Sequence, residues 1–211
     1  SNIALDLATA KAVAAEDRPI RLSGEGAFRG VPLTLDIEAG TPADLRSPAA
    51  RWPITFSLQT PDASLIARGT AALQSRTGDI DLQVTLRGER LNRLDPVLGW
   101  QMPALGPYEL TGRVSNQADG IALKDFRAQL GDSNVAGDVT FALTGQRKRV
   151  AGNLTSQTIR LDQLVDAIDS PIDSAKPPDL SLLVTALRSV DVTVEWAAKR
   201  VLLGPTVLGE V

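Results

Sequence analysis

Apolar and polar residues alternate along most of the chain, and this period of two predicts β-strands rather than helices. The clearest run is residues 80–86, where Ile, Leu, Val and Leu occupy every second position, with Asp, Gln and Thr between them. Strands with one apolar and one polar face are typical of antiparallel sheets that contact water on one side. Similar alternation predicts further strands at residues 20–28, 31–37, 54–58, 135–143 and 190–196.

One cassette of this pattern occurs twice, in residues 62–98 and again in residues 131–166. Each copy has two alternating runs joined by a polar turn and followed by a short Leu-rich amphipathic tail; Gly69 is equivalent to Gly137. A fixed internal period predicts stacked copies of one supersecondary unit, here strand, hairpin, strand and short helix. Short helices are therefore expected at residues 91–98, 161–168 and 180–187.

The repeat also predicts how the chain is divided. Ahead of the second copy, the apolar phase slips by one residue between Leu123 and Phe126, which predicts a β-bulge near Lys124 and Asp125. The expected segments are N-terminal strands (1–60), a first repeat unit (61–100), a second repeat unit (101–169), a Pro-rich linker (170–178) and the start of a third, truncated unit (179–211).

The predicted strands share an apolar face that a few short helices are too small to cover. The sheet must close on itself, pack against another sheet, or leave an open trough, which would need a ligand or partner. The expected fold is mainly β: a curved, antiparallel, repeat-built sheet, either a groove or a partly closed barrel or sandwich, with a few short amphipathic helices. The candidate groove-lining residues are Leu33, Leu35, Phe56, Leu58, Leu82, Val84, Val135, Val139, Phe141, Val192 and Val194.

The composition excludes several kinds of chemistry. The chain has no Cys and no His, which excludes thiol catalysis, disulfides, Cys/His zinc sites and His-dependent triads. A net charge of −3 and an aromatic content of 4% argue against nucleic acid as a partner. Asp79 and Asp81 share a polar strand face with Gln83, as solvated surface residues do. We expect no enzymatic activity, no catalytic residues, no cofactor and no metal, and the oligomeric state stays open.

A more specific signal lies in the order of several stretches: LSGEGAFRGVPLTL, then GDIDLQVTLRGERLNRLDPVLG, then LGDSNVAGDV followed by NLTSQTIRLDQL. In this order they resemble the AsmA family of Gram-negative envelope proteins. Gly152, Leu154, Ser156 and Leu161 match the family's pattern of Gly and Leu at strand spacing. The resemblance covers nearly the whole chain.

The resemblance implies a periplasmic body that is held in the inner membrane by one N-terminal helix, an anchor absent from this chain. The chain begins with Ser-Asn and no Met and stops within an alternating run, so we expect an excised fragment. The resemblance further implies phospholipid as a partner, carried in an apolar groove toward the outer membrane, or a role in outer-membrane assembly.

Two functional interpretations stay open at this point. The first is a non-enzymatic periplasmic segment of an inner-membrane-anchored AsmA-like protein, which lines an apolar groove for phospholipid transport or outer-membrane assembly. The second is a closed β-sandwich or barrel that serves as an envelope scaffold or protein-interaction module and holds no lipid. The two differ in whether the apolar strand faces are open or packed into a dry interior.

Overall fold

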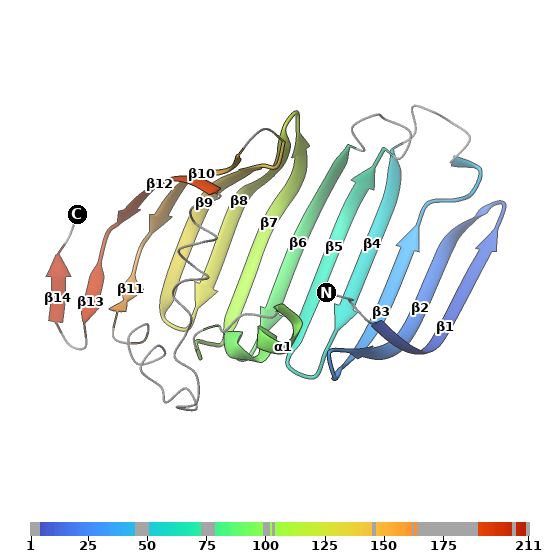
Figure 1. Ribbon diagram of the computed structural model, residues 1–211, viewed down its shortest axis with the longest axis horizontal. Coiled ribbons are helices and arrows are strands. Elements are labelled where there is room, and N and C mark those ends of the chain that lie inside the picture. The colour runs from blue at the N-terminus through green and yellow to red at the C-terminus, as the bar shows by residue number, and fades with distance from the viewer. Residues whose placement is uncertain are drawn as a thin grey trace.

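A single long sheet dominates the computed structural model of the chain, which describes residues 5–44, 51–72, 79–98, 102, 104–144, 147–161, 163, 190–203 and 206–209. Eleven strands lie side by side in the order β1 to β10 followed by β12 (Figure 1). At about 4.8 Å per strand, the sheet extends for about 48 Å across its strands. Its strands are β1 (Leu5–Ala15), β2 (Arg18–Phe28), β3 (Val31–Ala39), β4 (Trp52–Gln59), β5 (Ala63–Ala71), β6 (Ile80–Gly88), β7 (Tyr108–Gln117), β8 (Gly120–Leu130), β9 (Ser133–Ala142), β10 (Lys148–Ser156) and β12 (Val190–Ala198).

The sheet is open rather than closed. β1 and β12 are its two edges, and they do not pair with each other among the described strands. A second, three-stranded sheet adjoins the β12 end and consists of β11 (Ile159–Arg160), β13 (Val201–Leu203) and β14 (Thr206–Gly209). The predicted mainly β architecture is therefore confirmed, and among the described strands the long sheet is open rather than a closed barrel.

Short connections keep sequential strands adjacent. Arg29 and Gly30 join β2 to β3 with φ values of +49° and +80°, as a two-residue hairpin turn of the primed type requires. Two residues likewise join β7 to β8, between Gln117 and Gly120. From β1 to β10 every neighbouring pair is antiparallel, as the alternation predicts.

A β-bulge in β8 lies where the sequence places it. The register between β8 and β9 shifts between Leu123 and Phe126, and Asp125 has a φ of +51°. The Asp125 amide donates a hydrogen bond to the Asp138 carboxylate at 2.8 Å, which satisfies a backbone donor that the bulge removes from the ladder. Because of the bulge, Leu123 and Phe126 both stay on the apolar side of the sheet.

The repeated cassette forms equivalent elements but not identical pairings. β5 and β6 correspond to β9 and β10. In the first copy Gly69 faces Leu82, whereas in the second Gly137 faces Leu154 instead of Val150, the equivalent of Leu82. The sheet continues without a break across positions 60 and 100, so the proposed division into segments stays a prediction.

Two features at the ends of the units differ from a simple repeat. β12 pairs with β10 in parallel, not antiparallel, because the chain returns to the sheet in the same direction. The predicted helix at residues 91–98 is present as a 3₁₀ turn, η2 (Leu91–Leu94), followed by α1 (Asp95–Leu98). The predicted linker and helix at 180–187 lie outside the described residues, as does most of the helix at 161–168. No helix in the described ranges is long and apolar enough to span a bilayer.

Candidate functional site

One row of apolar residues crosses eight consecutive strands. Each member faces the next directly across a strand pair, beginning with Gly24 opposite Leu35 and ending with Ala128 opposite Val135. At about 4.8 Å per strand the row is about 34 Å long. We call this set the leucine row: Gly24, Leu35, Leu58, Leu65, Leu86, Leu110, Ala128 and Val135.

A parallel row on the same side of the sheet crosses ten strands. It begins at Ile20 in β2 and ends at Val194 in the edge strand β12. We call this set the second row: Ile20, Ala39, Ile54, Gly69, Leu82, Val114, Leu123, Val139, Gly152 and Val194. The two rows and the side chains in phase with them form what we call the apolar face, which contains no charged side chain in either row.

All eleven residues that the sequence analysis proposes as groove lining lie on this face. Leu35, Leu58 and Val135 belong to the leucine row, and Leu82, Val139 and Val194 belong to the second row. The other five, in phase with these along their strands, are Leu33, Phe56, Val84, Phe141 and Val192. Whether they line a ligand groove stays a prediction.

The sequence-based set missed several members of the face. Leu65, Leu86 and Leu110 sit at the centre of the leucine row, each directly opposite another leucine. Alternation alone could have identified Leu86, which is in phase with Leu82 and Val84. The strands that contain Leu65 and Leu110 do not alternate strictly between apolar and polar residues; in β5, for example, Ile66 follows Leu65 directly. Only the cross-strand register therefore shows that Leu65 and Leu110 lie on the apolar face.

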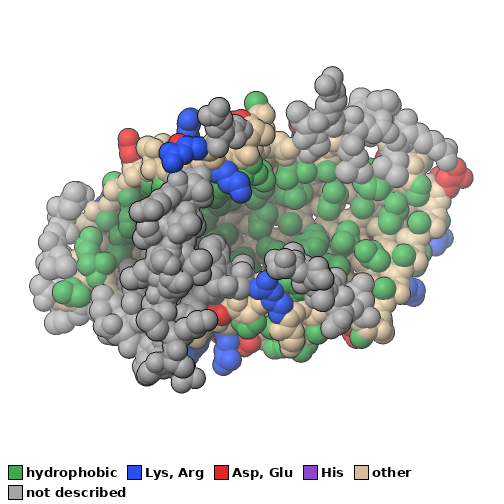
Figure 2. Space-filling model, in the orientation of Figure 1, with side chains coloured by type: hydrophobic (Ala, Val, Ile, Leu, Met, Phe, Trp, Pro, Cys, Tyr) green, Lys and Arg blue, Asp and Glu red, His purple; other side chains and the backbone are tan. Residues whose placement is uncertain are grey.

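Few of the described side chains are buried, and four of the seven buried apolar residues are alanines. The described apolar residues with low exposure are mostly alanines such as Ala67 and Ala71, and no large side chain is fully buried. Near the β12 end, Phe141, Val192 and Trp196 are 38%, 51% and 53% exposed. Figure 2 shows hydrophobic side chains spread across this face, with charged side chains mainly along its rims. The face is therefore not the interior of a closed core among the described residues.

The opposite face of the sheet is polar and carries ion pairs between neighbouring strands. The Arg113 guanidinium donates two hydrogen bonds to the Asp81 carboxylate, one of them at 2.6 Å. These bonds hold the pKa of Asp81 below its ordinary value, while the carboxylate raises the pKa of Arg113. Similar exposed pairs join Arg21 to Glu38 and Arg87 to Glu109 across strands, where exposed pairs contribute little stability. The Arg21–Glu38 and Arg87–Glu109 pairs join directly opposed residues and the Asp81–Arg113 pair joins diagonal ones, so all three favour the observed register.

Three cavities of about 670, 560 and 360 Å³ lie away from both apolar rows. The first two follow a polar cross-strand row that includes Thr34, Gln59 and Ser64. Leu33 contributes to the first, and the Asp81–Arg113 pair lines the third. In the described ranges no three or more Asp or Glu side chains are grouped to hold a metal ion. The bound guanidinium lowers the pKa of the Asp81 carboxyl, which is opposite to the raised pKa of a general acid.

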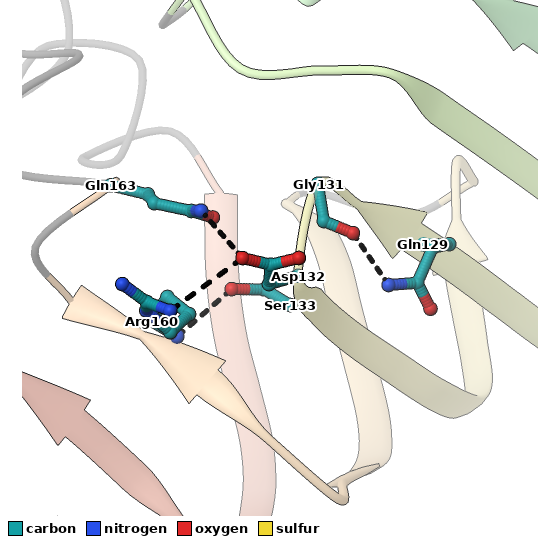
Figure 3. Close-up of polar contacts among 6 residues, drawn as sticks. All are labelled: Gln129, Gly131, Asp132, Ser133, Arg160 and Gln163. Carbon is teal, nitrogen blue, oxygen red and sulfur yellow. Dashed lines mark hydrogen bonds and ion pairs between the residues drawn. The ribbon is translucent and has the colours of Figure 1, made fainter.

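A cluster of polar contacts fixes the corner where β10 leads into β11 (Figure 3). Asp132, in the turn between β8 and β9, accepts a hydrogen bond from Gln163 at 3.0 Å and lies 3.6 Å from the Arg160 guanidinium. The Arg160 amide donates to the Ser133 hydroxyl at 2.9 Å. These contacts hold the corner against the β8–β9 turn while Ile159 is buried with 5% exposure. The end of the apolar face is thus fixed by polar side chains at its border.

The fold and this face define an open β-sheet protein with one apolar side and one charged side. A curated relative matches it: over 165 residues the chain is 24% identical to the AsmA family protein YhjG of Escherichia coli (strain K12), a match that covers 76% of this chain. The chain spans about a quarter (24%) of the length of that relative. No family model matches the chain, and no solved structure does. The match to YhjG confirms the resemblance to the AsmA family that the sequence motifs indicate.

Proposed function

We propose that this chain is a non-enzymatic segment of an AsmA-like envelope protein, and that its apolar face forms a groove which holds the acyl chains of phospholipid. The observation that carries this proposal is the uninterrupted apolar surface across the sheet, combined with its exposure. Soluble monomers rarely expose contiguous apolar patches larger than a few hundred Å², so a face of this extent requires an occupant.

The dimensions of the face fit acyl chains. A bilayer core of about 30 Å contains two layers of acyl chains, so one chain extends for about 15 Å. The leucine row of about 34 Å is long enough for two such chains end to end. Each methylene moved out of water contributes about 0.8 kcal/mol when fully buried. An acyl chain of about 16 carbons that lies on one open face with half of its surface covered gains about 6 kcal/mol.

The cellular setting follows from the family resemblance. In this proposal the chain lies in the periplasm, the longer protein is anchored in the inner membrane, and the bound phospholipid moves along the face during outer-membrane assembly. A continuous apolar face suits transfer along the sheet better than storage of one molecule.

The competing interpretation is a scaffold or protein-interaction module of the envelope that holds no lipid. Its closed sandwich or barrel form does not agree with the open sheet. The form that still agrees is an open sheet whose apolar face is covered by another protein. The experiment below separates this form from the lipid groove, because only the groove retains phospholipid after purification of the chain alone.

Native mass spectrometry of the gently purified chain, followed by lipid extraction, tests the proposal. We expect bound phospholipid in near-stoichiometric amounts, lost in Val84→Asp and in Val139→Asp, because lipid would bury an unpaired carboxylate. The matched control is Gln83→Asp, which adds the same charge next to Val84 but on the polar face, between Arg68 and Arg113. Circular dichroism verifies that each variant keeps its sheet.

A lipid-free mass after incubation with phospholipid vesicles would contradict the proposal and favour the scaffold. Equal loss of lipid in Val84→Asp and Gln83→Asp would also contradict it, because binding would then depend on net charge rather than on the apolar face.

A further inference from the structure

The hydroxyl of Tyr108 is buried and has no hydrogen-bond partner among the described residues. The whole residue is only 4% exposed. A buried polar group without a partner lowers stability, and a phenylalanine would fill the same space without that cost. Burial raises the pKa of Tyr108, which keeps the hydroxyl protonated and able to donate. An unpaired hydrogen-bond donor is therefore held in place at this position.

Tyr108 lies at the end of the apolar face, directly beyond the leucine row. It is opposite Gly88, and two residues further along the strands the row continues with Leu86 opposite Leu110. Gly88 makes room for the hydroxyl, because a Cβ there would collide with it and would lie 2.7 Å from the Asp62 carbonyl oxygen. The unpaired donor thus lies between the end of the leucine row and the turn from β4 to β5.

The η2 turn, which follows β6 at this end, adds a second unpaired atom and a cation. The side-chain oxygen of Asn92 is buried without a hydrogen-bond partner among the described residues. The next residue, Arg93, has its Nε atom 4.0 Å from the Asp62 carboxylate, which is too long for a hydrogen bond. The Arg93 side chain is 62% exposed, so it is available to a second anion.

The opposite end of the same strand pair differs. There Asn116, in phase with Val114 on the apolar face, accepts a hydrogen bond from the Ile80 amide at 3.1 Å. The polar side chain at that end is paired within the chain, whereas the buried oxygens of Tyr108 and Asn92 are not. The Tyr108 end is therefore the one suited to the polar part of a ligand.

A cavity of about 560 Å³ adjoins Tyr108 at the rim of the sheet, a volume within the range of small-molecule sites. Beside Tyr108 its lining includes Thr60, Asp62, Gly88, Glu89 and Pro107. The surroundings thus combine donors that suit a phosphate, Tyr108 and Arg93, with carboxylates that suit an amine. This combination fits a group that carries both charges.

We propose that this rim site holds the head group of a phospholipid, a phosphate linked to an amine, while the acyl chains lie along the leucine row. The Tyr108 hydroxyl and the Arg93 guanidinium donate hydrogen bonds to the phosphate. The Asn92 oxygen and the carboxylates of Asp62 and Glu89 accept hydrogen bonds from the ammonium. Because the Tyr108 hydroxyl is covered, binding must include a side-chain rearrangement beside it. The inference deepens the proposed function and rests on it, since it needs acyl chains on the apolar face.

Three lipids with the same fluorescent acyl chain test the site: phosphatidylethanolamine, phosphatidic acid, which lacks the amine, and diacylglycerol, which lacks both groups. The natural sequence should bind phosphatidylethanolamine most tightly and diacylglycerol most weakly. Tyr108→Phe should weaken the binding of phosphatidylethanolamine about tenfold and leave that of diacylglycerol within about twofold, because only the phosphate accepts the lost hydrogen bond. The same variant should melt at a higher temperature, so weaker binding cannot result from a less stable fold.

Two charge variants form a matched pair. Arg93→Gln should weaken the binding of phosphatidylethanolamine about fivefold or more. Arg21→Gln removes an exposed guanidinium that is paired with Glu38 on the polar face, and it should leave this affinity within about twofold. Glu89→Gln should reduce the preference for phosphatidylethanolamine over phosphatidic acid.

Tyr108 is the only tyrosine in the chain, which provides a direct readout. A ¹³C label at the ring carbon that bears the hydroxyl gives a single resonance. The resonance should shift when phosphatidylethanolamine binds and should stay in place when diacylglycerol binds.

Three results would overturn the inference. The first is equal affinity of the natural sequence for phosphatidylethanolamine and diacylglycerol, which rejects the head-group site and leaves the apolar groove standing. The second is an unchanged affinity for phosphatidylethanolamine in Tyr108→Phe. The third is binding of free phosphoethanolamine as tight as that of the lipid, because the acyl chains would then have no part. If none of the three lipids binds, the proposed function fails and this inference fails with it.

Discussion

Leu65 and Ile66 are neighbours in β5 with side chains on opposite faces of the sheet, and this makes them a matched pair for testing the apolar face. Leu65 lies in the leucine row between Leu58 and Leu86. Ile66 lies on the polar face, between Ser57 and Thr85. Both side chains are partly buried. Replacing either with Ala removes the same number of carbon atoms from the same strand.

The expected magnitudes follow from how much of each side chain is covered. Three carbon groups contribute about 2.4 kcal/mol when fully buried, at about 0.8 kcal/mol each. Burial of about two-thirds of each side chain contributes about 1.6 kcal/mol in the fold itself, so Leu65→Ala and Ile66→Ala should lower the free energy of unfolding by similar amounts. The remaining third of Leu65 is covered only when an acyl chain lies on the face. Leu65→Ala should therefore weaken lipid binding by about 0.8 kcal/mol, or about fourfold, whereas Ile66→Ala should leave it within about twofold.

Titration with a phospholipid that carries a fluorescent acyl chain measures the affinities, and denaturant unfolding measures the stabilities. Equal weakening of lipid binding in the two variants would refute the reasoning, because affinity would then follow stability and not the face. An unchanged affinity in Leu65→Ala, with lipid still bound, would show that the acyl chain does not contact the leucine row.

Two further predictions concern the fold. Tyr108 is 4% exposed and its hydroxyl lacks a hydrogen-bond partner among the described residues; burial, with a smaller effect of Asp62, raises its pKa. Tyr108→Phe should therefore raise the free energy of unfolding by about 1 kcal/mol and the melting temperature by about 2–4 °C, whereas a lower melting temperature would reveal a partner for the hydroxyl. The Arg113 hydrogen bonds depress the pKa of Asp81 below 3.8, so the carboxylate stabilises the fold above that pH and loses this effect as pH falls through the folded-state pKa. Asp81→Asn should lower the melting temperature at neutral pH, with the difference from the natural sequence vanishing in strong acid; a difference of constant size across the pH range would argue against the ion pair.

Much of the sheet could be read from the sequence because strand alternation has a strict period of two. The run at residues 80–86 became β6, and the phase slip after Leu123 became the bulge at Asp125. The turn at Arg29 and Gly30 has positive φ at two successive positions, so it too depends on local geometry. Strands and bulges depend on the conformation of neighbouring residues, so the order of apolar and polar residues along the chain predicts them.

The sequence analysis did not predict β1, because its residues lack a clear apolar–polar alternation. Residues 5–15 are rich in Ala, which has little preference for either face, so no apolar period distinguishes them. Pairing with β2 decides their conformation. The sequence pattern also did not predict that β12 pairs with β10 in parallel, because the direction of a strand depends on the path by which the chain returns to the sheet.

The sequence by itself determined which residues share a face: all eleven proposed groove-lining residues lie on one side of the sheet, since parity along a strand fixes the side. Only the tertiary structure decided that the described strands form an open sheet and not a closed one. Closure depends on the sum of many small twists and on whether the two edges meet, and here β1 and β12 do not pair. Cross-strand register also brought Leu65, Leu86 and Leu110 into one row, because register couples residues that are distant in sequence and leaves no mark in any single strand.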